Sequence, residues 1–423
     1  MCCVAKPTRP NRDGCAAKRG EDPAVMKILN VIASLDPRHG GPIDGTLRLT
    51  EVWRASGHEV ASATLDPPDA PYLPDDDQVF ALGEPRPPAR DPIRRFWNRF
   101  GYAPQMVPWL RTHAPAYDAV VVHALWNYST VAARRALVGG PTPWFVFPHG
   151  ALDPWFRETY PAKHAAKSLL WRVNEGVLMN RAAAALFTTA EEARLAERAF
   201  SPWHVRSRVV GFGSLDAPPG AERQVAAFRA ACPALRERRF LLFLSRIHPK
   251  KGCDLLVDAF AAEAAADPAL DLVIAGPDQL GWQAELAKCA AALGLGTRIH
   301  WPGMLTGDTK WGAYRAAEAF VLPSHSENFG VVVAEALACS TPVLITDKVN
   351  LWREVASARA GLVATDTPAG IAALLADWRA LGTDARAEMR TAARACYEAN
   401  FRFEAAAARM IEVFEEAREA KKA

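Results

Sequence analysis

The sequence lacks any uninterrupted apolar segment of the roughly 20 residues that a membrane-spanning helix needs. Residues 1–25 are rich in Lys, Arg, Pro and Gly and lack the apolar core of a secretory signal peptide. We therefore expect a protein that is not integral to a membrane. Residues 1–25 are expected to be a disordered leader, or Met26 to be the natural start of the chain.

The sequence also lacks a strong charge imbalance and any metal-type spacing of cysteines. Its 50 Lys and Arg residues against 47 Asp and Glu give a formal net charge of +3, so bulk charge gives no support to a nucleic-acid partner. Its eight cysteines are scattered singly, apart from Cys2 and Cys3, and form no disulfide framework. Unpaired thiols favour a cytoplasmic location.

Short apolar runs alternate with helical segments through both halves of the 423-residue chain. This alternation is typical of α/β proteins with parallel sheets, and the length requires two or three domains. We predict two doubly wound α/β domains that face each other across a cleft. The predicted divisions are a first domain at 26–212, a linker at 213–224, a second domain at 225–395 and a returning C-terminal helix at 396–423.

A strand, loop and helix near the end of the second half carry two glutamates. The apolar run at 319–323 ends in a polar loop containing Glu327, Gly330 breaks the chain, and the following helix contains Glu335. Such a helix N-terminus suits a phosphate, and the two carboxylates could bind sugar hydroxyls. An ordinary strand–helix–strand unit with surface glutamates is the alternative.

Two cations follow the first strand of the second domain. The apolar run at 240–245 is followed by Arg246 and, five residues later, Lys251. Cations in a loop beyond a strand can clamp a pyrophosphate, although a charged surface turn has the same composition.

These motifs resemble a known enzyme family. Glu327 and Glu335 reproduce the E-x7-E signature of retaining glycosyltransferases, and PSHSENFGVVVAEALA at 323–338 is similar to family 4 in particular. The Arg246–Gly252 segment resembles the family's R-x4-K-G, and His149–Gly150, just past a strand, resembles its His-Gly pair. The resemblance covers nearly all of residues 26–415 and implies the GT-B fold, with two Rossmann-like domains.

The resemblance also implies a role for individual residues. The first domain would bind the acceptor and the second the nucleotide sugar. The implied groups are His149 and Glu327 as catalytic residues; Arg246, Lys251, Gly40, Gly41, Phe329 and Gly330 at the diphosphate; and Glu335, Asp278 and Met304 at the nucleoside.

The predicted function is that of a retaining hexosyltransferase. It would move a hexose from a GDP- or UDP-sugar to a hydroxyl of a saccharide acceptor, favoured to be lipid-linked, in surface polysaccharide (exopolysaccharide) synthesis. No metal or other cofactor is expected. The alternatives are a GT-B epimerase or hydrolase of nucleotide sugars, and a catalytically inactive scaffold subunit.

The sequence 75–77 matches the D-x-D pattern of metal-dependent glycosyltransferases. No strong buried strand leads into it, and residues 66–92 are crowded with proline, so we interpret it as a solvated acidic loop in an irregular insertion.

The segment Ile93–Phe100 has one apolar stripe at helical spacing, with arginines on its other faces. A basic helix with an aromatic face could lie on an anionic membrane surface, giving a cytoplasmic protein peripheral to the membrane. The preferred interpretation is that the helix packs on the core of its domain. A long helical region is expected at 155–181. Its cations could contact an anionic acceptor or a lipid headgroup, with an ordinary solvated face as the alternative. His123 is interpreted as structural.

Overall fold

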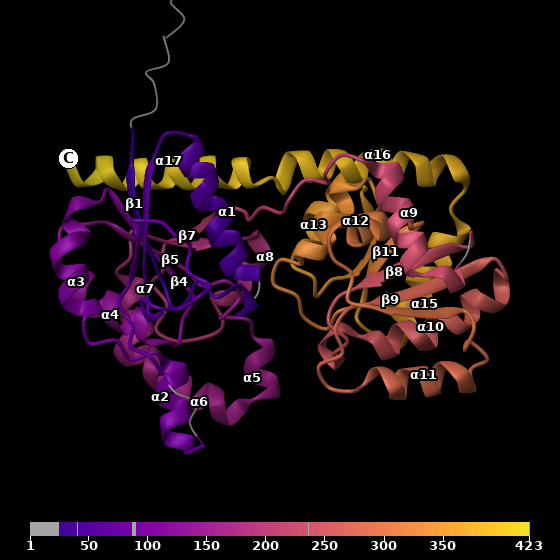
Figure 1. Cartoon of the computed structure of the whole chain (residues 1–423), viewed down its shortest axis with the longest axis horizontal. Coiled ribbons are helices and arrows are strands. Elements are labelled where there is room, and N and C mark those ends of the chain that lie inside the picture. Colours follow the sequence, from indigo (N-terminus) through magenta and orange to yellow (C-terminus); the bar gives the residue numbers. More distant parts are fainter. Residues whose placement is uncertain (1–24, 40, 87–89, 236, 423) are drawn as a thin grey trace, which may run out of the picture.

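The computed structural model describes residues 25–39, 41–86, 90–235 and 237–422. Each half of the chain folds around its own parallel β-sheet, and the two domains stand next to each other (Figure 1). The predicted doubly wound α/β architecture is confirmed. None of the helices in the described part of the chain is long and apolar enough to span a membrane.

The first sheet has the strand order β3-β2-β1-β4-β5-β6-β7, with parallel pairing throughout. The order reverses between β1 and β4, so the loops after these two strands run in opposite directions and leave a crevice at the carboxyl edge. The strands are β1 (Lys27–Ile32), β2 (Glu59–Thr64), β3 (Val79–Ala81), β4 (Ala119–His123), β5 (Trp144–Phe147), β6 (Ala184–Phe187) and β7 (Ser207–Val209).

Helices cover this sheet because its strands are apolar on both faces; β4 and β5 are buried along their whole length. The helices are α1 (Gly41–Ala55), α2 (Pro92–Phe100), α3 (Met106–His113), α4 (Tyr128–Leu137), α5 (Trp155–Thr159), α6 (Pro161–Leu170), α7 (Gly176–Asn180) and α8 (Ala190–Ala196).

The second sheet has the order β10-β9-β8-β11-β12-β13, also parallel, and reverses between β8 and β11. Its strands are β8 (Arg239–Leu244), β9 (Leu270–Ala275), β10 (Ile299–Gly303), β11 (Ala319–Leu322), β12 (Val343–Thr346) and β13 (Gly361–Ala364). Its helices are α9 (Ala221–Ala231), α10 (Cys253–Ala266), α11 (Gln283–Ala292), α12 (Gly307–Ala316), α13 (Val331–Ala338), α14 (Trp352–Ala358) and α15 (Pro368–Ala380).

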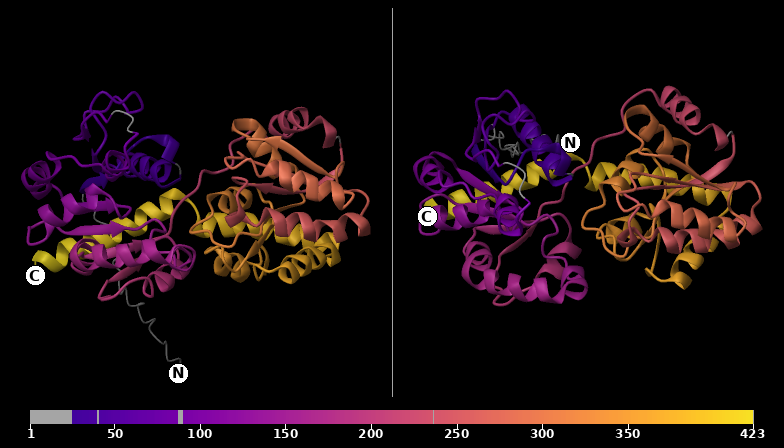
Figure 2. Two further views of the ribbon diagram at one scale, coloured as in Figure 1. Left: turned by 90° about the horizontal axis from the view of Figure 1, so that it is seen from below. Right: turned by 60° about the horizontal axis from the view of Figure 1, so that its bottom comes forward.

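Two C-terminal helices, α16 (Thr383–Asn400) and α17 (Phe403–Lys422), run from the second domain back to the first (Figure 2). Phe414 of α17 packs on Trp53 and Phe145, and the Trp53 indole donates to the carbonyl of Ala407 at 3.2 Å. This apolar contact ties the end of the chain to the first domain.

Three local expectations are corrected. The insertion at 66–92 contains β3, which extends the sheet, and α9 begins at Ala221, inside the predicted linker. The expected long helix at 155–181 is divided by Pro161, which has no N–H to donate, and by a π-helical turn at Trp171–Glu175.

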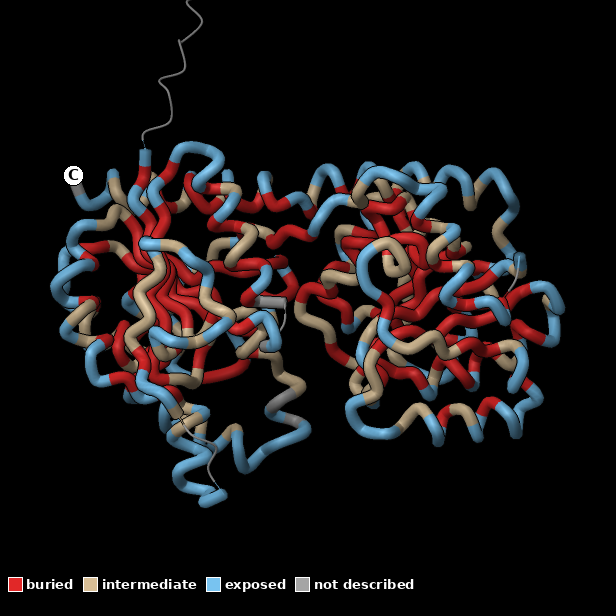
Figure 3. The backbone as a smooth tube through the Cα atoms, in the orientation of Figure 1, coloured by how far each residue is buried: buried red, intermediate tan, exposed pale blue. Residues whose placement is uncertain are grey.

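The preferred interpretation of α2 holds only for the end of its apolar stripe. Ile93, Phe96 and Trp97 of its apolar stripe are 50–68% exposed. Only Phe100, at the end of the helix, packs on the core of the domain. The helix lies in an exposed part of the first domain (Figure 3). The helix still forms because Asp91 caps it and Gly101 ends it in a left-handed conformation.

Candidate active site

A cavity of about 530 Å³ lies between the domains, at the carboxyl ends of both sheets. Five of the predicted site residues line it. They are His149, Arg246, Glu327, Phe329 and Gly330.

The sheet topology explains why these residues meet. Arg246 follows β8 and Glu327 follows β11, which are the two strands at the reversal of the second sheet. His149 follows β5 of the first sheet. Ligands of open α/β sheets bind at such edges, so the cavity is the candidate site of the whole chain.

Lys251 makes an ion pair with Glu327. A residue predicted to bind the diphosphate thus contacts a residue predicted to bind the sugar. Burial lowers the pKa of Lys251 to about 7, with the neighbouring cations Lys250 and Arg246 acting in the same direction. The carboxylate of Glu327 acts in the opposite direction. A bound anion would therefore raise the pKa of Lys251 and favour its charged form.

The N-terminus of α13 points its backbone N–H groups at the cavity. Gly330 has φ 74°, a left-handed conformation that ends the loop and starts the helix. Phe329 is buried against Phe212 and Phe401, with ring centroids 5.4 and 5.8 Å away. These contacts fix the helix end in place.

Glu335 lies inside α13 and is buried. One of its oxygens accepts from Lys310 Nζ at 2.6 Å and the other from the Tyr314 hydroxyl at 3.0 Å. Burial and the adjacent Glu335 raise the pKa of Tyr314 well above its ordinary value, so the hydroxyl stays a donor. Lys310 and Tyr314 were not predicted, because their distance from Glu335 in the sequence hides the contact.

Lys251, Glu335 and the other predicted residues that the structure describes do not line this cavity. The Asp278 carboxylate accepts from the backbone N–H groups of Trp282 and Gln283, both at 3.0 Å, and so starts α11. The Met304 side chain is exposed, Gly41 begins α1, and Gly40 lies outside the described residues. Arg38, which was not predicted, adds a cation to the cavity wall.

His149 stands at the end of a hydrogen-bonded series inside the first domain. Its Nε2 lies 3.0 Å from Nδ1 of His123, and Nε2 of His123 lies 3.0 Å from Oδ1 of Asn30. The Asn30 amide nitrogen donates to Thr50, so its oxygen faces His123 and requires a proton on Nε2 of that ring. Burial lowers the pKa of His123 to about 3, so the ring is neutral and its Nδ1 accepts from His149.

This arrangement agrees with the structural interpretation of His123, whose buried ring bonds Asn30 and His149. Burial and then His123 hold the pKa of His149 well below the ordinary value, so this ring is also neutral. Since Nδ1 of His123 accepts, the one proton of His149 lies on Nε2. Its Nδ1 is then an acceptor for a ligand hydroxyl. The sequence signal available for the contact between the two histidines was their position at the ends of the neighbouring strands β4 and β5.

Gly150 lets the two domains approach closely. It has φ 76°, and a Cβ atom there would lie 2.6 Å from Cγ of Asn328 in the second domain. Its N–H donates at 2.8 Å to buried Glu192, which also accepts from the N–H and hydroxyl of Thr188, both at 2.7 Å. Burial raises the pKa of Glu192. This unpredicted residue holds the turn that carries His149.

Further contacts join the domains around the cavity. The Ser326 hydroxyl donates to Asp153, and Arg353 Nη2 pairs with Glu191 at 3.0 Å. A second cavity of about 610 Å³ lies within the first domain and shares His149, while Ser34, Tyr72 and Arg86 supply polar groups to its wall.

The described part of the chain contains no group of three or more His, Cys, Asp or Glu side chains arranged to hold a metal ion. In the D-x-D segment, the middle residue Asp76 pairs with Arg54 at 2.6 Å, and none of 75–77 lines either cavity.

Two family models match successive parts of the chain. Residues 40–213 match the model described as "Glycosyl transferase 4-like domain", and residues 227–395 match "Glycosyl transferases group 1".

Curated relatives match part of the chain. Two proteins named D-inositol 3-phosphate glycosyltransferase are similar. The protein from Thermobispora bispora is 36% identical over 209 residues, 47% of each chain, and that from Thermomonospora curvata is 35% identical over 192 residues, 42% of this chain and 43% of the relative. The match thus spans less than half the length of these relatives.

Solved structures share the fold across the chain. Sucrose-phosphate synthase of Thermosynechococcus elongatus has a TM-score of 0.71 at 19% identity, covering 93% of this chain and all of that one. Anabaena HepE in complex with UDP and glucose has a TM-score of 0.67 at 18% identity, covering 92% of this chain and all of that one. With the two family models, these matches show that the chain belongs to the family 4 glycosyltransferases, whose fold is GT-B.

Proposed function

We propose that this protein transfers a hexose from a nucleotide-diphospho-sugar to a hydroxyl group of a saccharide acceptor, with retention at the anomeric carbon. The observation that carries the proposal is the convergence of Arg246, the Lys251–Glu327 pair, the α13 N-terminus and His149 on one cavity between the domains.

The reaction breaks the bond from the anomeric carbon to the diphosphate and forms a bond to the acceptor oxygen. The departing diphosphate gains negative charge, which Arg246, Lys251 and the N–H groups at the start of α13 are placed to stabilise. These fixed cations and dipoles support a metal-independent reaction.

A bound donor would change the partners of Lys251. A diphosphate beside Lys251 would compete for its charge and leave the Glu327 carboxylate able to accept from hydroxyls of the hexose. His149 Nδ1 would accept from a further hydroxyl and orient the sugar. We propose that the acceptor proton passes to the leaving phosphate oxygen on the same face of the sugar.

The second cavity, which reaches His149 from the first domain, would hold the acceptor. We favour a lipid-linked saccharide of surface polysaccharide synthesis, presented at the cytoplasmic face of the membrane. The names of the curated relatives make inositol phosphate a second acceptor to test.

The test is incubation with UDP- or GDP-hexoses in EDTA, with and without candidate acceptors, followed by nucleotide assay and proton NMR of the product. The proposal predicts acceptor-dependent nucleotide release and an anomeric configuration equal to that of the donor. Faster release without acceptor would indicate a hydrolase or epimerase, and an inverted product would contradict retention. No release with any donor would favour a scaffold.

A further inference from the structure

Exposed apolar side chains gather on two segments of the first domain. On α2 these are Ile93, Phe96 and Trp97, and at the end of α6 they are Leu169, Leu170 and Val173; all six are 45–68% exposed. Tyr102 and Tyr160, at one end of each segment, are also exposed. We call the residues 90–102 and 160–173 the α2–α6 surface.

Both segments lie at the same end of the first domain, the lower end in Figure 1. A series of ring contacts connects them through the start of α4. Lys167 of α6 lies over the Trp126 ring at 4.7 Å, and Tyr128, two residues later, packs on Phe100 and Tyr102 with centroids 6.0 and 4.9 Å away. The two segments are therefore neighbours at this end of the first domain.

The α2–α6 surface is strongly basic in a chain that is nearly neutral overall. Its cations outnumber its acids seven to one. The one acid, Asp91, accepts from the backbone N–H of Arg94 at 2.7 Å as the cap of α2. The seven cations are Arg90, Arg94, Arg95, Arg99, Lys163, Lys167 and Arg172.

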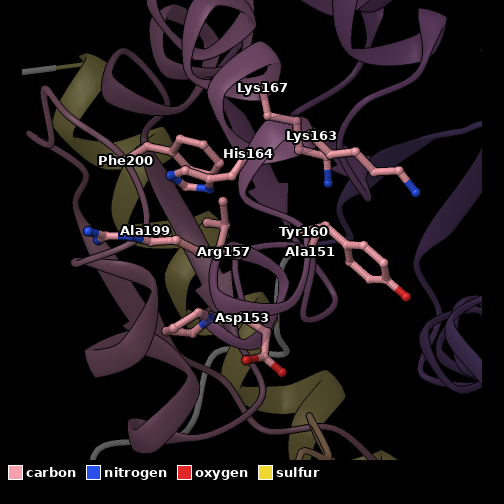
Figure 4. A pocket seen from close by; sticks show the side chains of 11 residues that line it. Ala151, Asp153, Arg157, Tyr160, Lys163, His164, Lys167, Ala199 and Phe200 are labelled. Carbon is pink, nitrogen blue, oxygen red and sulfur yellow. The ribbon is translucent and has the colours of Figure 1, made fainter. Parts of the chain in front are cut away.

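Cations of the α2–α6 surface also border a small hollow beside α6. Figure 4 shows Lys163, His164 and Lys167 beside Arg157 and Tyr160 around a small hollow. Burial lowers the pKa of Lys167, and the buried Glu175 acts in the opposite direction. Asp153, at the edge of this hollow, accepts from Ser326 of the second domain.

We infer that the α2–α6 surface docks on an anionic lipid bilayer. Exposed aromatic and aliphatic side chains flanked by arginine and lysine match the headgroup region, where apolar groups insert and cations meet lipid phosphates. A protein partner of this chemistry would need a matching acidic face, whereas an anionic bilayer supplies that charge along both segments.

The position of the α2–α6 surface gives membrane docking a functional consequence. Asn98, Phe100 and Gly101 of the α2 end line the cavity that reaches His149. A saccharide on a membrane lipid would therefore enter close to the bound donor. Only this use depends on the proposed function; docking itself does not.

The test is flotation of the full chain with vesicles of phosphatidylcholine alone or with phosphatidylserine. We expect binding to the anionic vesicles only, weakened by salt. Arg90→Ser, Arg94→Ser and Arg95→Ser together should lower the affinity by about fivefold per arginine. Phe96→Ser with Trp97→Ser, or Leu169→Ser with Leu170→Ser, should each lower it about tenfold, less dependent on salt.

The matched control is Val209→Ser with Leu215→Ser, which removes exposed apolar side chains away from this surface and should float like the wild type. Nucleotide binding in solution should be unchanged in every variant, which separates a failure of docking from a failure of the proposed function. Equal flotation of wild type and both apolar variants would overturn the inference. The inference would also be overturned if light scattering showed that the wild type is a dimer and that Leu169→Ser with Leu170→Ser dissociates it.

Discussion

Nδ1 of His123 lies 3.0 Å from Nε2 of His149, at the carboxyl ends of two adjacent parallel strands. Both rings are neutral because burial lowers their pKa values, and Asn30 sets the proton position in the first ring and hence in the second. His149 thus lines the cavity with its proton fixed on Nε2, and we propose that His123 positions it.

Replacement of His123 by Phe should remove this control while keeping a buried ring. We expect turnover to fall roughly ten- to hundredfold, because misorientation of a group that positions the substrate weakens catalysis. Nucleotide affinity should be unchanged. His113→Phe, which changes an exposed histidine, is the control. Equal turnover in the two variants would show that His123 only fills space.

The lowered pKa of Lys251 predicts a pH-dependent affinity for UDP. Above a pH of about 7 the free protein increasingly holds this lysine uncharged, whereas a diphosphate requires the charged form. Affinity should therefore be level below that pH and fall above it, by at most about tenfold per pH unit. Calorimetry across pH 6 to 9 measures the slope. Lys251→Met should bind UDP more weakly and lose the slope. An unchanged slope in this variant would mean that another group causes the pH dependence.

The close approach of Gly150 to Asn328 predicts a specific effect of Gly150→Ala. The new Cβ would meet Asn328 at 2.6 Å and should force the domains apart, lowering turnover. Gly139→Ala is the matched control, since Gly139 also has a positive φ, 86°, but faces open space. Both changes should cost about 1–2 kcal/mol of stability. Loss of activity in both alike would mean that backbone strain, and not domain contact, is responsible.

The two glutamates should have separable effects. Glu335→Ala should weaken UDP binding roughly tenfold, since a buried hydrogen-bonded charge near the nucleotide is lost. Glu327→Ala should mainly lower turnover, by roughly a hundredfold, because its hydroxyl contacts strengthen in the transition state. Steady-state kinetics and calorimetry separate these effects, with exposed Glu404→Ala as the control. Wild-type turnover of Glu327→Ala would remove the role given to Glu327.

Much of this account was predictable because its signals are local. Alternating apolar strands and helices predicted both sheets, and the sequence places Arg246 and Glu327 just after strands of the second one. Parallel sheets bring all their carboxyl ends to one edge, so residues far apart in the chain are placed by topology alone.

The contacts that were missed depend on packing between distant segments. Nothing local in the sequence shows that Lys310 reaches Glu335, or that Glu192 holds the N–H of Gly150. Most of the apolar stripe of α2 was placed wrongly for a related reason. Periodicity shows that a helix has an apolar face but not whether the protein itself covers that face.

The most direct test of the central claim is nucleotide binding without metal. In EDTA, a panel of UDP, GDP, ADP, dTDP and CMP is scored by thermal shift on wild type, Arg246→Ala and the surface control Arg94→Ser. A ligand at about 100 times its dissociation constant should stabilise the protein by about 2.7 kcal/mol. We predict that one nucleoside diphosphate stabilises the wild type and Arg94→Ser and stabilises Arg246→Ala much less. Stabilisation by none of them, or only after a divalent metal is added, would contradict a diphosphate site built from the chain's own cations.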